Sequence, residues 1–143
     1  MNDDFKEFDI DEIQVGMTAS SSHVITDHDI VSFAEISGDK NPVHLDEEFA
    51  VTTRFKKRIA HGLMSSSYFS ALFGTQLPGR GCVYVSQNLN FKRPVYIGDE
   101  VIAMIEVIDV NIDSRRVHFN TCCKVKNKTV IDGTAEIYIP PKG

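Results

Sequence analysis

The sequence predicts a single α+β domain in which one long helix is wrapped by an antiparallel β-sheet. Three observations support this fold class. Residues 60–79 are apolar with helical spacing, the chain after Gly81 alternates with the period of strands, and 143 residues suffice to bury one core without disulfides. We expect residues 1–143 to form one domain, with residues 1–20 as an N-terminal extension whose role the sequence does not indicate.

A first, short helix is predicted after residue 26. Thr26 and Asp29 have the spacing of a capping box, and Gly38 can end the helix. Three apolar residues share one face of this helix: Ile30, Phe33 and Ala34. Asn41-Pro42 then predicts a turn, because proline moves the residue before it out of the helical region. Another short helix is expected over residues 46–52.

The central helix is predicted within residues 60–79. Its apolar residues surround most of the helix, with small serines between them: Leu63, Met64, Tyr68, Phe69, Ala71, Leu72 and Phe73. A helix that is apolar or small on nearly every side is typical of a buried position. Pro78-Gly79 ends it.

The rest of the chain predicts strands. Residues 82–91 alternate loosely, and residues 101–110 are apolar on both faces, as in a central strand that is covered on both sides. Residues 117–125 and 131–139 alternate clearly with period two. The helices are therefore expected first and the strands afterwards. Because an open antiparallel sheet has edges to protect, we expect two such sheets to pair in a homodimer.

Composition and charge exclude several classes of function. The net charge of -5 leaves no basic surplus for binding nucleic acid. The three cysteines lack the spacing of a metal site, and their odd number does not fit a disulfide framework, which predicts free thiols in a reducing compartment. No apolar run has the length of a membrane span, and the acidic N-terminus lacks a signal sequence. We expect a cytoplasmic protein with no nucleic-acid or membrane partner.

Asp39 and His44 are the first candidates for chemistry. They flank the Asn41-Pro42 turn, so they can meet only if the loop folds back. A carboxylate beside an imidazole can polarise water and move a proton near neutral pH. On this spacing alone, a capped turn with a surface histidine is favoured over a catalytic pair.

The start of the central helix, Ala60-His61-Gly62, is the second candidate. No Ser, Thr, Asp or Asn directly precedes the helix, and Gly62 has no side chain to block a ligand. The free amides of a helix N-terminus can bind an oxyanion. Capping by water or by Ser65 is an equally good explanation. We interpret His61 as a packed or capping histidine, and most of the serines as small packing residues.

The segment "FAEISGDKNPVHLDEEFA", residues 33–50, resembles the signature of the (R)-specific enoyl-CoA hydratases, also called hydratase 2 or MaoC-like dehydratases. That signature requires an aromatic residue, a small residue followed by Gly-Asp-x-Asn-Pro, an aliphatic residue, His, and a small residue six positions later. "IAHGLMSSSYFSALFGTQLPG" and "YVSQNLNFKRPVYIGDEV" are also similar to the family, so the resemblance covers residues 24–139. It implies a single hot-dog fold, usually in a homodimer.

The resemblance implies residue roles. Asp39 and His44 would be the catalytic pair, and the Gly62 amide would bind the thioester carbonyl. Together they would add water reversibly to trans-2-enoyl-CoA and form (R)-3-hydroxyacyl-CoA. Coenzyme A belongs to the substrate, and neither a metal nor another cofactor is required. Which group protonates C2 is left open.

Substrate contacts are also expected around this pair. Asn41 holds the loop, and three residues are candidates for the wall of an acyl tunnel: Ser70, Phe69 and Phe73. Two basic clusters could meet the phosphates of coenzyme A, although solvated surface is the favoured explanation for each: Lys56-Lys57-Arg58 and Lys92-Arg93.

Three alternatives remain at this point. A 3-hydroxyacyl-thioester dehydratase with an acyl-carrier-protein substrate would use the same residues. A hot-dog thioesterase would need a carboxylate directed at C1, which the Gly-Asp-x-Asn-Pro-x-His segment disfavours. A non-catalytic acyl-binding module would not need both Asp39 and His44.

Overall fold

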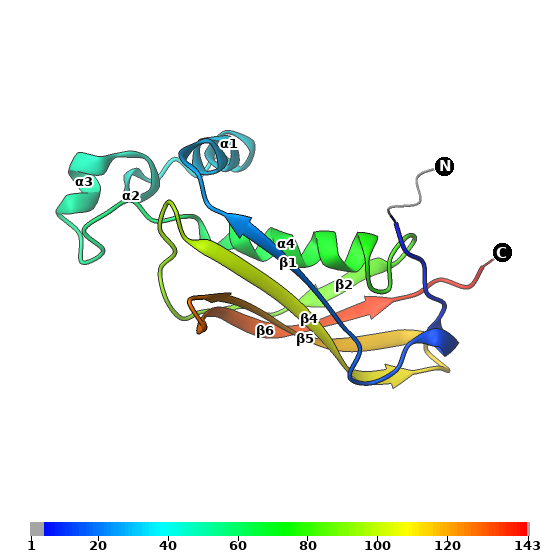
Figure 1. Cartoon of the computed structure of the whole chain (residues 1–143). Coiled ribbons are helices and arrows are strands. Elements are labelled where there is room, and N and C mark those ends of the chain that lie inside the picture. Colours follow the sequence, from blue (N-terminus) through cyan, green and yellow to red (C-terminus); the bar gives the residue numbers. More distant parts are fainter. Residues whose placement is uncertain (1–4, 143) are drawn as a thin grey trace.

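The computed structural model describes residues 5–142 and places one long helix against a face of a six-stranded antiparallel sheet (Figure 1). The helix is α4 (Gly62–Thr75). The strands are β1 (Thr18–Val24), β2 (Val83–Gln87), β3 (Asn90–Phe91), β4 (Glu100–Asn111), β5 (Arg116–Val125) and β6 (Lys128–Tyr138). Their order across the sheet is β1-β4-β5-β6-β2, with β3 pairing with β6. The predicted hot-dog arrangement is confirmed.

Four short elements complete the fold: η1 (Ile10–Glu12), α1 (Asp27–Ser37), α2 (Pro42–Leu45) and α3 (Glu47–Val51). Helices α1, α2 and α3 lie together beyond one end of the sheet (Figure 1). The predicted capping box of α1 is confirmed, since Thr26 and Asp29 cap each other's backbone amides. Gly38 ends α1 with a φ of 78°, a left-handed conformation that glycine adopts without strain.

The hydrophobic core lies between α4 and the sheet. Phe69, Leu72 and Phe73 of α4 are almost fully buried, and the inward residues of β5 and β6 are buried with them. The alternation predicted for the last two strands is confirmed: Val117, Phe119, Thr121 and Cys123 point inward in β5. Cys123 is also buried, and burial raises the pKa of its thiol to about 12. It is therefore a packing residue rather than a nucleophile.

The predicted order of elements is wrong in one respect, because β1 precedes the helices. This strand has the sequence TASSSHV and pairs along its length with β4. It lies at the edge of the sheet and is mostly exposed, so it lacks the alternating apolar residues by which a strand is recognised.

Two predicted surfaces are also more exposed than expected. The outer face of β4 is not covered, since Ile102 and Ile108 are about two-fifths exposed while Val101 and Ala103 are buried. Helix α4 has an open side as well: Leu63, Ser67, Ser70, Ala71 and Gly74. The sequence pattern shows that these positions are apolar or small, but it cannot show which of them a single chain leaves uncovered.

The N-terminal segment packs on the domain rather than extending from it. Ile10 and Ile13 are buried in the core. The amides of Lys6 and Phe8 donate to the carbonyls of Thr75 and Pro78 at 2.9 and 2.8 Å. Residues 1–4 of the predicted extension lie outside the described residues.

Within residues 5–142, no helix is both long enough and apolar enough to cross a membrane. The expected compartment stays a prediction.

Candidate active site

A turn built from side-chain to backbone hydrogen bonds holds Asp39. The Asp39 amide donates to Ser37 Oγ at 3.0 Å, and the Asn41 amide donates to Asp39 Oδ1 at 3.2 Å. Asn41 Oδ1 in turn accepts from the Val43 amide at 3.1 Å and caps α2, whose first residue is Pro42. Asn41 therefore shapes the loop as predicted, and one Asp39 oxygen remains free to face His44.

His44 points back toward Asp39 across the turn. Its Nδ1 lies 2.7 Å from the Ile59 carbonyl, and its Nε2 lies 3.9 Å from Asp39 Oδ2. A carbonyl only accepts hydrogen bonds, so Nδ1 carries the hydrogen and the neutral ring presents the Nε2 lone pair to Asp39. The structure thus brings together the two residues that the sequence placed on either side of Pro42.

Burial lowers the pKa of His44 below its ordinary value. The bond to the Ile59 carbonyl opposes this shift, neighbouring His61 adds to it, and the Asp39 carboxylate opposes it. The net direction keeps the imidazole neutral at neutral pH, where Nε2 can accept a proton. Asp39 is about half exposed, so its carboxylate is open to water and ligand while His44 is shielded.

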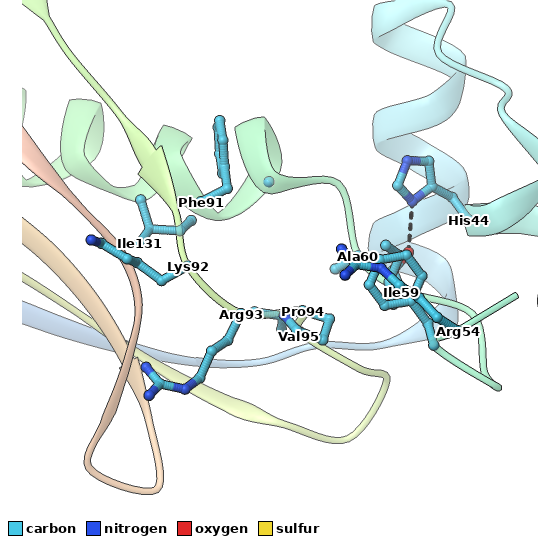
Figure 2. Close-up of a pocket in the computed structure, with 12 residues that line it drawn as sticks. His44, Arg54, Ile59, Ala60, Phe91, Lys92, Arg93, Pro94, Val95 and Ile131 are labelled. Carbon is cyan, nitrogen blue, oxygen red and sulfur yellow. Dashed lines mark hydrogen bonds between the residues drawn. The ribbon is translucent and has the colours of Figure 1, made fainter.

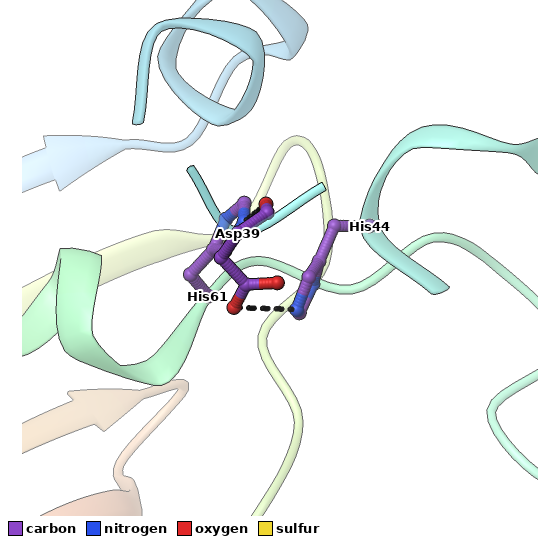
Figure 3. A group of neighbouring side chains, drawn as sticks. All are labelled: Asp39, His44 and His61. Atoms are coloured by element: carbon purple, nitrogen blue, oxygen red, sulfur yellow. Dashed lines mark hydrogen bonds and ion pairs between the residues drawn. The ribbon is translucent and has the colours of Figure 1, made fainter. Parts of the chain in front are cut away.

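His61 belongs to the same cluster, although the sequence indicated only a packed or capping histidine. Its ring is 2% exposed and stacks on His44 with centroids 3.8 Å apart (Figure 3). Its Nε2 lies 3.0 Å from the main-chain carbonyl of Asp39. It makes no side-chain cap for α4. The adjacent Gly62 was the only signal in the sequence that this position belongs to the site.

The N-terminus of α4 opens on this cluster. No side chain among residues 5–142 caps the helix, and its first turn contains no acidic residue. Ser65, the alternative cap, has a buried Oγ without a hydrogen-bond partner in the described part of the chain, so it does not fulfil that role. The Met64 amide already donates to the His61 carbonyl at 3.1 Å, so within the first turn the Gly62 and Leu63 amides, together with the helix dipole, remain for a negatively charged oxygen.

Phe91 of β3 lies directly over Gly62, a contact that sequence reasoning missed. A Cβ built on Gly62 would lie 2.4 Å from Phe91 Cε1, so the ring rests on the glycine. The ring is also 56% exposed. Position 62 needs glycine because any side chain there would collide with this ring unless the ring moved.

Two hollows meet at this point and share three residues: His44, Gly62 and Phe91. The first hollow, of about 390 Å³, contains Asp39, His61, Phe33 and Leu63. The second, of about 230 Å³, contains basic residues and apolar residues of the loops beside β3 (Figure 2). An elongated ligand could lie in both hollows with its reactive centre beside His44 and Gly62.

The second hollow contains part of the predicted basic surface. Lys92 and Arg93 line it together with Arg54, which was not singled out from the sequence (Figure 2). Arg58 has a different role, because its guanidinium donates to the His44 carbonyl at 2.7 Å and pairs with Asp27 at 2.7 Å. Arg58 therefore holds α2, the short helix that carries His44, against α1.

The three candidates for an acyl tunnel lie apart from the Asp39–His44 pair. Phe69 and Phe73 are in the core, where Phe73 packs edge-on against Phe119 with centroids 4.8 Å apart. Ser70 lines a separate surface hollow of about 340 Å³ between α4 and β2. Contact of these residues with a ligand stays a prediction.

Asp39, His44 and His61 form the one group of described residues whose metal-ligating atoms lie within 4.8 Å of one another. The two histidine rings are stacked with an interplanar angle of 26°. Because imidazole lone pairs lie in the ring plane, those of stacked rings run side by side instead of converging on one ion. The arrangement suits proton transfer better than metal ligation.

Comparison with known proteins places this geometry in context. A family model described as a MaoC-like domain matches residues 11–133. An (R)-specific enoyl-CoA hydratase of Rhodospirillum rubrum is 45% identical, over 93% of this chain and 92% of its own length. A mitochondrial 3-hydroxyacyl-[acyl-carrier-protein] dehydratase of Arabidopsis thaliana is 39% identical, over 90% of this chain and 78% of its own length.

The fold has a solved counterpart. The unliganded structure of an R-hydratase from Pseudomonas aeruginosa superposes with a TM-score of 0.88 at 42% identity. The superposition covers 95% of this chain and 88% of the hydratase chain.

Proposed function

The chain belongs to the family of MaoC-like domains, and we propose that it catalyses the reversible hydration of trans-2-enoyl-CoA to (R)-3-hydroxyacyl-CoA. One observation carries this proposal. Two proton acceptors, Asp39 Oδ2 and His44 Nε2, face each other at 3.9 Å beside the uncapped N-terminus of α4. The Asp39–His44 pair is spaced to bind a water molecule, and the N-terminus of α4 can bind the oxygen of a thioester carbonyl.

Asp39 and His44 would hold the attacking water. A water with hydrogen bonds of about 2.8 Å to both acceptors, roughly at right angles, requires them to be about 4 Å apart. Both atoms accept, so the water donates both hydrogens and directs a lone pair at C3 of the enoyl group. One acceptor takes a proton as the C3–O bond forms, and a proton returns to C2. Water is thereby added across the double bond with no net change in the enzyme.

The α4 N-terminus would stabilise the negative charge that develops on the thioester oxygen. Attack at C3 moves the π electrons through C2 onto that oxygen, forming an enolate. The Gly62 N–H and the dipole of α4 favour this charge more than the neutral carbonyl, so they lower the barrier. The absence of acidic residues from the first turn of α4 supports this role.

The two hollows suggest how the substrate lies. The coenzyme A portion would occupy the second hollow, where Arg54, Lys92 and Arg93 can approach its phosphates. The enoyl portion would enter the first hollow, between Phe33 and Leu63. Asn41 would act by shaping the Asp39 loop, while Ser70, Phe69 and Phe73 would contact only longer chains. No cofactor is proposed beyond the coenzyme A of the substrate.

We also propose a homodimer formed through the β2 edge. Val83, Tyr84 and Val85 of this edge strand are 38–46% exposed, and Leu63 of α4 beside them is 61% exposed. Such an exposed strand edge invites pairing with a second copy, which would extend the sheet and cover the open side of α4. The oligomeric state can be measured by sedimentation, and Val85→Lys is expected to weaken the dimer.

The proposed activity is tested with crotonyl-CoA. We expect purified protein to remove the absorbance of the conjugated double bond and to yield (R)-3-hydroxybutyryl-CoA on chiral analysis. Release of free thiol with the double bond retained would instead indicate a thioesterase. Binding without turnover would indicate an acyl-binding module.

An acyl-carrier-protein dehydratase is the second candidate, favoured by the 39% identity to the Arabidopsis thaliana protein. The catalytic residues would be the same, and only the carrier of the thioester would differ. Comparing kcat/KM for matched enoyl thioesters of coenzyme A and of acyl carrier protein separates the two. We expect the coenzyme A thioester to be preferred.

A further inference from the structure

His61 contacts both members of the Asp39–His44 pair, although it transfers no proton in the proposed hydration. Its ring contacts the rings of both Phe33 and His44, with centroid distances of 4.9 and 3.8 Å. Its Nε2 is 3.0 Å from the main-chain oxygen of Asp39 (Figure 3). The same residue immediately precedes Gly62, so it is attached to the helix terminus that would bind the carbonyl.

The hydrogen-bond pattern of His61 is costly for a residue that only packs. The Asp39 carbonyl can only accept, so Nε2 carries the hydrogen and the neutral ring has a bare lone pair on Nδ1. That Nδ1 is buried without a hydrogen-bond partner among the described residues. A buried acceptor without a partner destabilises a fold. Phenylalanine would fill a similar space without this cost, so packing alone does not explain a histidine here.

We propose that His61 is a positioning residue for the hydration, holding the Asp39 main chain through its Nε2–H and supporting the face of the His44 ring. Asp39 lies in the turn before α2 and His44 lies in α2, both beyond the end of the sheet, whereas Gly62 begins the buried helix. His61 links the two, so it sets the acid–base pair at a fixed distance from the Gly62 amide. This inference rests on the proposed function and adds a residue to that same site.

His61 also affects the charge state of His44. The groups that face His44 are Asp39, from the turn before α2, and His61, at the N-terminus of α4. Arg58 contacts the His44 carbonyl and pairs with Asp27 of α1, and Arg54 lines a hollow with His44. Of these, His61 opposes protonation of His44 whenever it carries a proton itself, so replacing His61 removes this effect and lets the base take up a proton at higher pH.

Two substitutions separate the contacts of His61. His61→Phe keeps an aromatic ring on His44 but loses the bond to Asp39, and His61→Gln restores an N–H near the position of Nε2 without the ring. We expect His61→Phe to lower kcat for crotonyl-CoA about 10- to 100-fold while changing KM less than about three-fold, because misplacement of the pair affects the chemical step. We expect His61→Gln to stay within about ten-fold of the parent kcat.

Nitrogen NMR of the histidine rings gives a readout that does not depend on any substrate. In His61→Phe we expect the His44 titration to move to higher pH, and the acid limb of kcat/KM to move with it. A residue that only packs would move neither. His28→Gln is the matched control, because His28 is exposed on α1 and its Nε2 lies 3.5 Å from Ser32 Oγ of the same helix. It should leave both readouts unchanged.

The outcomes are distinct. A folded His61→Phe with kcat within about two-fold of the parent and an unchanged His44 titration overturns the proposal. If His61→Phe does not fold, His61→Gln decides, since a loss larger than about ten-fold in the folded variant also overturns it. If the parent itself does not hydrate crotonyl-CoA, the proposed function has failed. The His44 titration then decides the inference about His61 alone.

Discussion

The two ends of α4 differ in whether other parts of the chain cover them. At the C-terminal end, the carbonyls of Thr75 and Pro78 accept hydrogen bonds from the N-terminal segment, through the amides of Lys6 and Phe8. At the N-terminal end, none of the described side chains caps the helix, and Gly62 lines two hollows. The same helix is therefore closed by its own chain at one end and left available to a ligand at the other.

Charges follow the same division. Beside the C-terminal end, Glu7 lies 2.9 Å from Arg80 and 3.4 Å from Lys142, and Asp9 pairs with Arg115. At the N-terminal end, Asp39 and His44 are 3.9 Å apart, too far for a direct hydrogen bond. Polar groups that satisfy each other stabilise the fold, whereas groups held apart can engage water and substrate. Substitutions at the two ends should therefore affect different properties.

The largest effect is expected from the acid–base pair. Asp39→Asn and His44→Ala should each lower kcat for crotonyl-CoA about 10²- to 10⁴-fold, because each removes one of the two groups that can take a proton from the water. The melting temperature should change little for Asp39→Asn, since Asp39 is about half exposed. Because the two residues act as a unit, the double variant should be about as slow as the slower single variant. Folded variants with near-parental turnover would contradict the assignment of the pair.

Gly62→Ala should have the next largest effect on activity. Its Cβ would lie 2.4 Å from Phe91 Cε1, so the ring must move into a hollow that the substrate needs. We expect kcat/KM to fall about 10- to 100-fold. Adding Phe91→Ala makes room for the Cβ and should restore part of the loss. If the double variant is as slow as Gly62→Ala, the methyl group acts on the ligand and not through Phe91.

Ile10→Ala tests the N-terminal segment that covers the C-terminal end of α4. Ile10 is 3% exposed, and truncating a buried isoleucine costs about 2–4 kcal/mol of unfolding free energy. Denaturant unfolding measures this loss. At a temperature where the variant is folded, kcat should match the parent, because η1, the dark-blue turn that contains Ile10, lies at the end of the molecule opposite α2 (Figure 1). A loss of kcat without a loss of stability would contradict the division between the two ends.

The pH dependence of activity should show the lowered pKa of His44. In the proposed reaction the neutral imidazole would be the active form, and burial holds its pKa below the ordinary value of 6.5. Activity should therefore be retained below pH 6.5 and should fall only as the pH passes through the lowered pKa. The acid limb of kcat/KM, measured over a range in which the protein stays folded, tests this direction. An acid limb with its midpoint above pH 6.5 would contradict a lowered pKa of His44.

The smallest effect is expected from Glu7→Gln. Hydrogen bonds from Arg80 and then Lys142 lower the pKa of Glu7. A carboxylate with a lowered pKa stabilises the fold above its unfolded pKa, and this contribution is lost as the pH falls through the folded pKa. Melting temperatures of the Gln variant should therefore depend slightly less on pH in the acid range than those of the parent. Turnover at neutral pH should be unchanged.

Much of the fold followed from local patterns in the chain. The capping box of α1, the stop at Gly38 and the alternation of β5 and β6 are each set by residues close in sequence, and each is confirmed. β1 was missed because an exposed edge strand needs hydrogen bonds from β4 rather than an apolar pattern of its own. Likewise, the apolar pattern of β4 and α4 could not show which faces a single chain leaves open.

In the site, too, some features follow from local motifs and others only from tertiary packing. The sequence by itself determined the chemistry available, since Asp39, His44 and Gly62 lie within short motifs whose residue types suit acid–base and oxyanion roles. Only the tertiary structure decided that His61 stacks on His44 and bonds to Asp39, and that Phe91 covers Gly62. These contacts join residues separated by 17 to 29 positions. Such contacts depend on how helix, loop and sheet pack together, and no local pattern of residues encodes that packing.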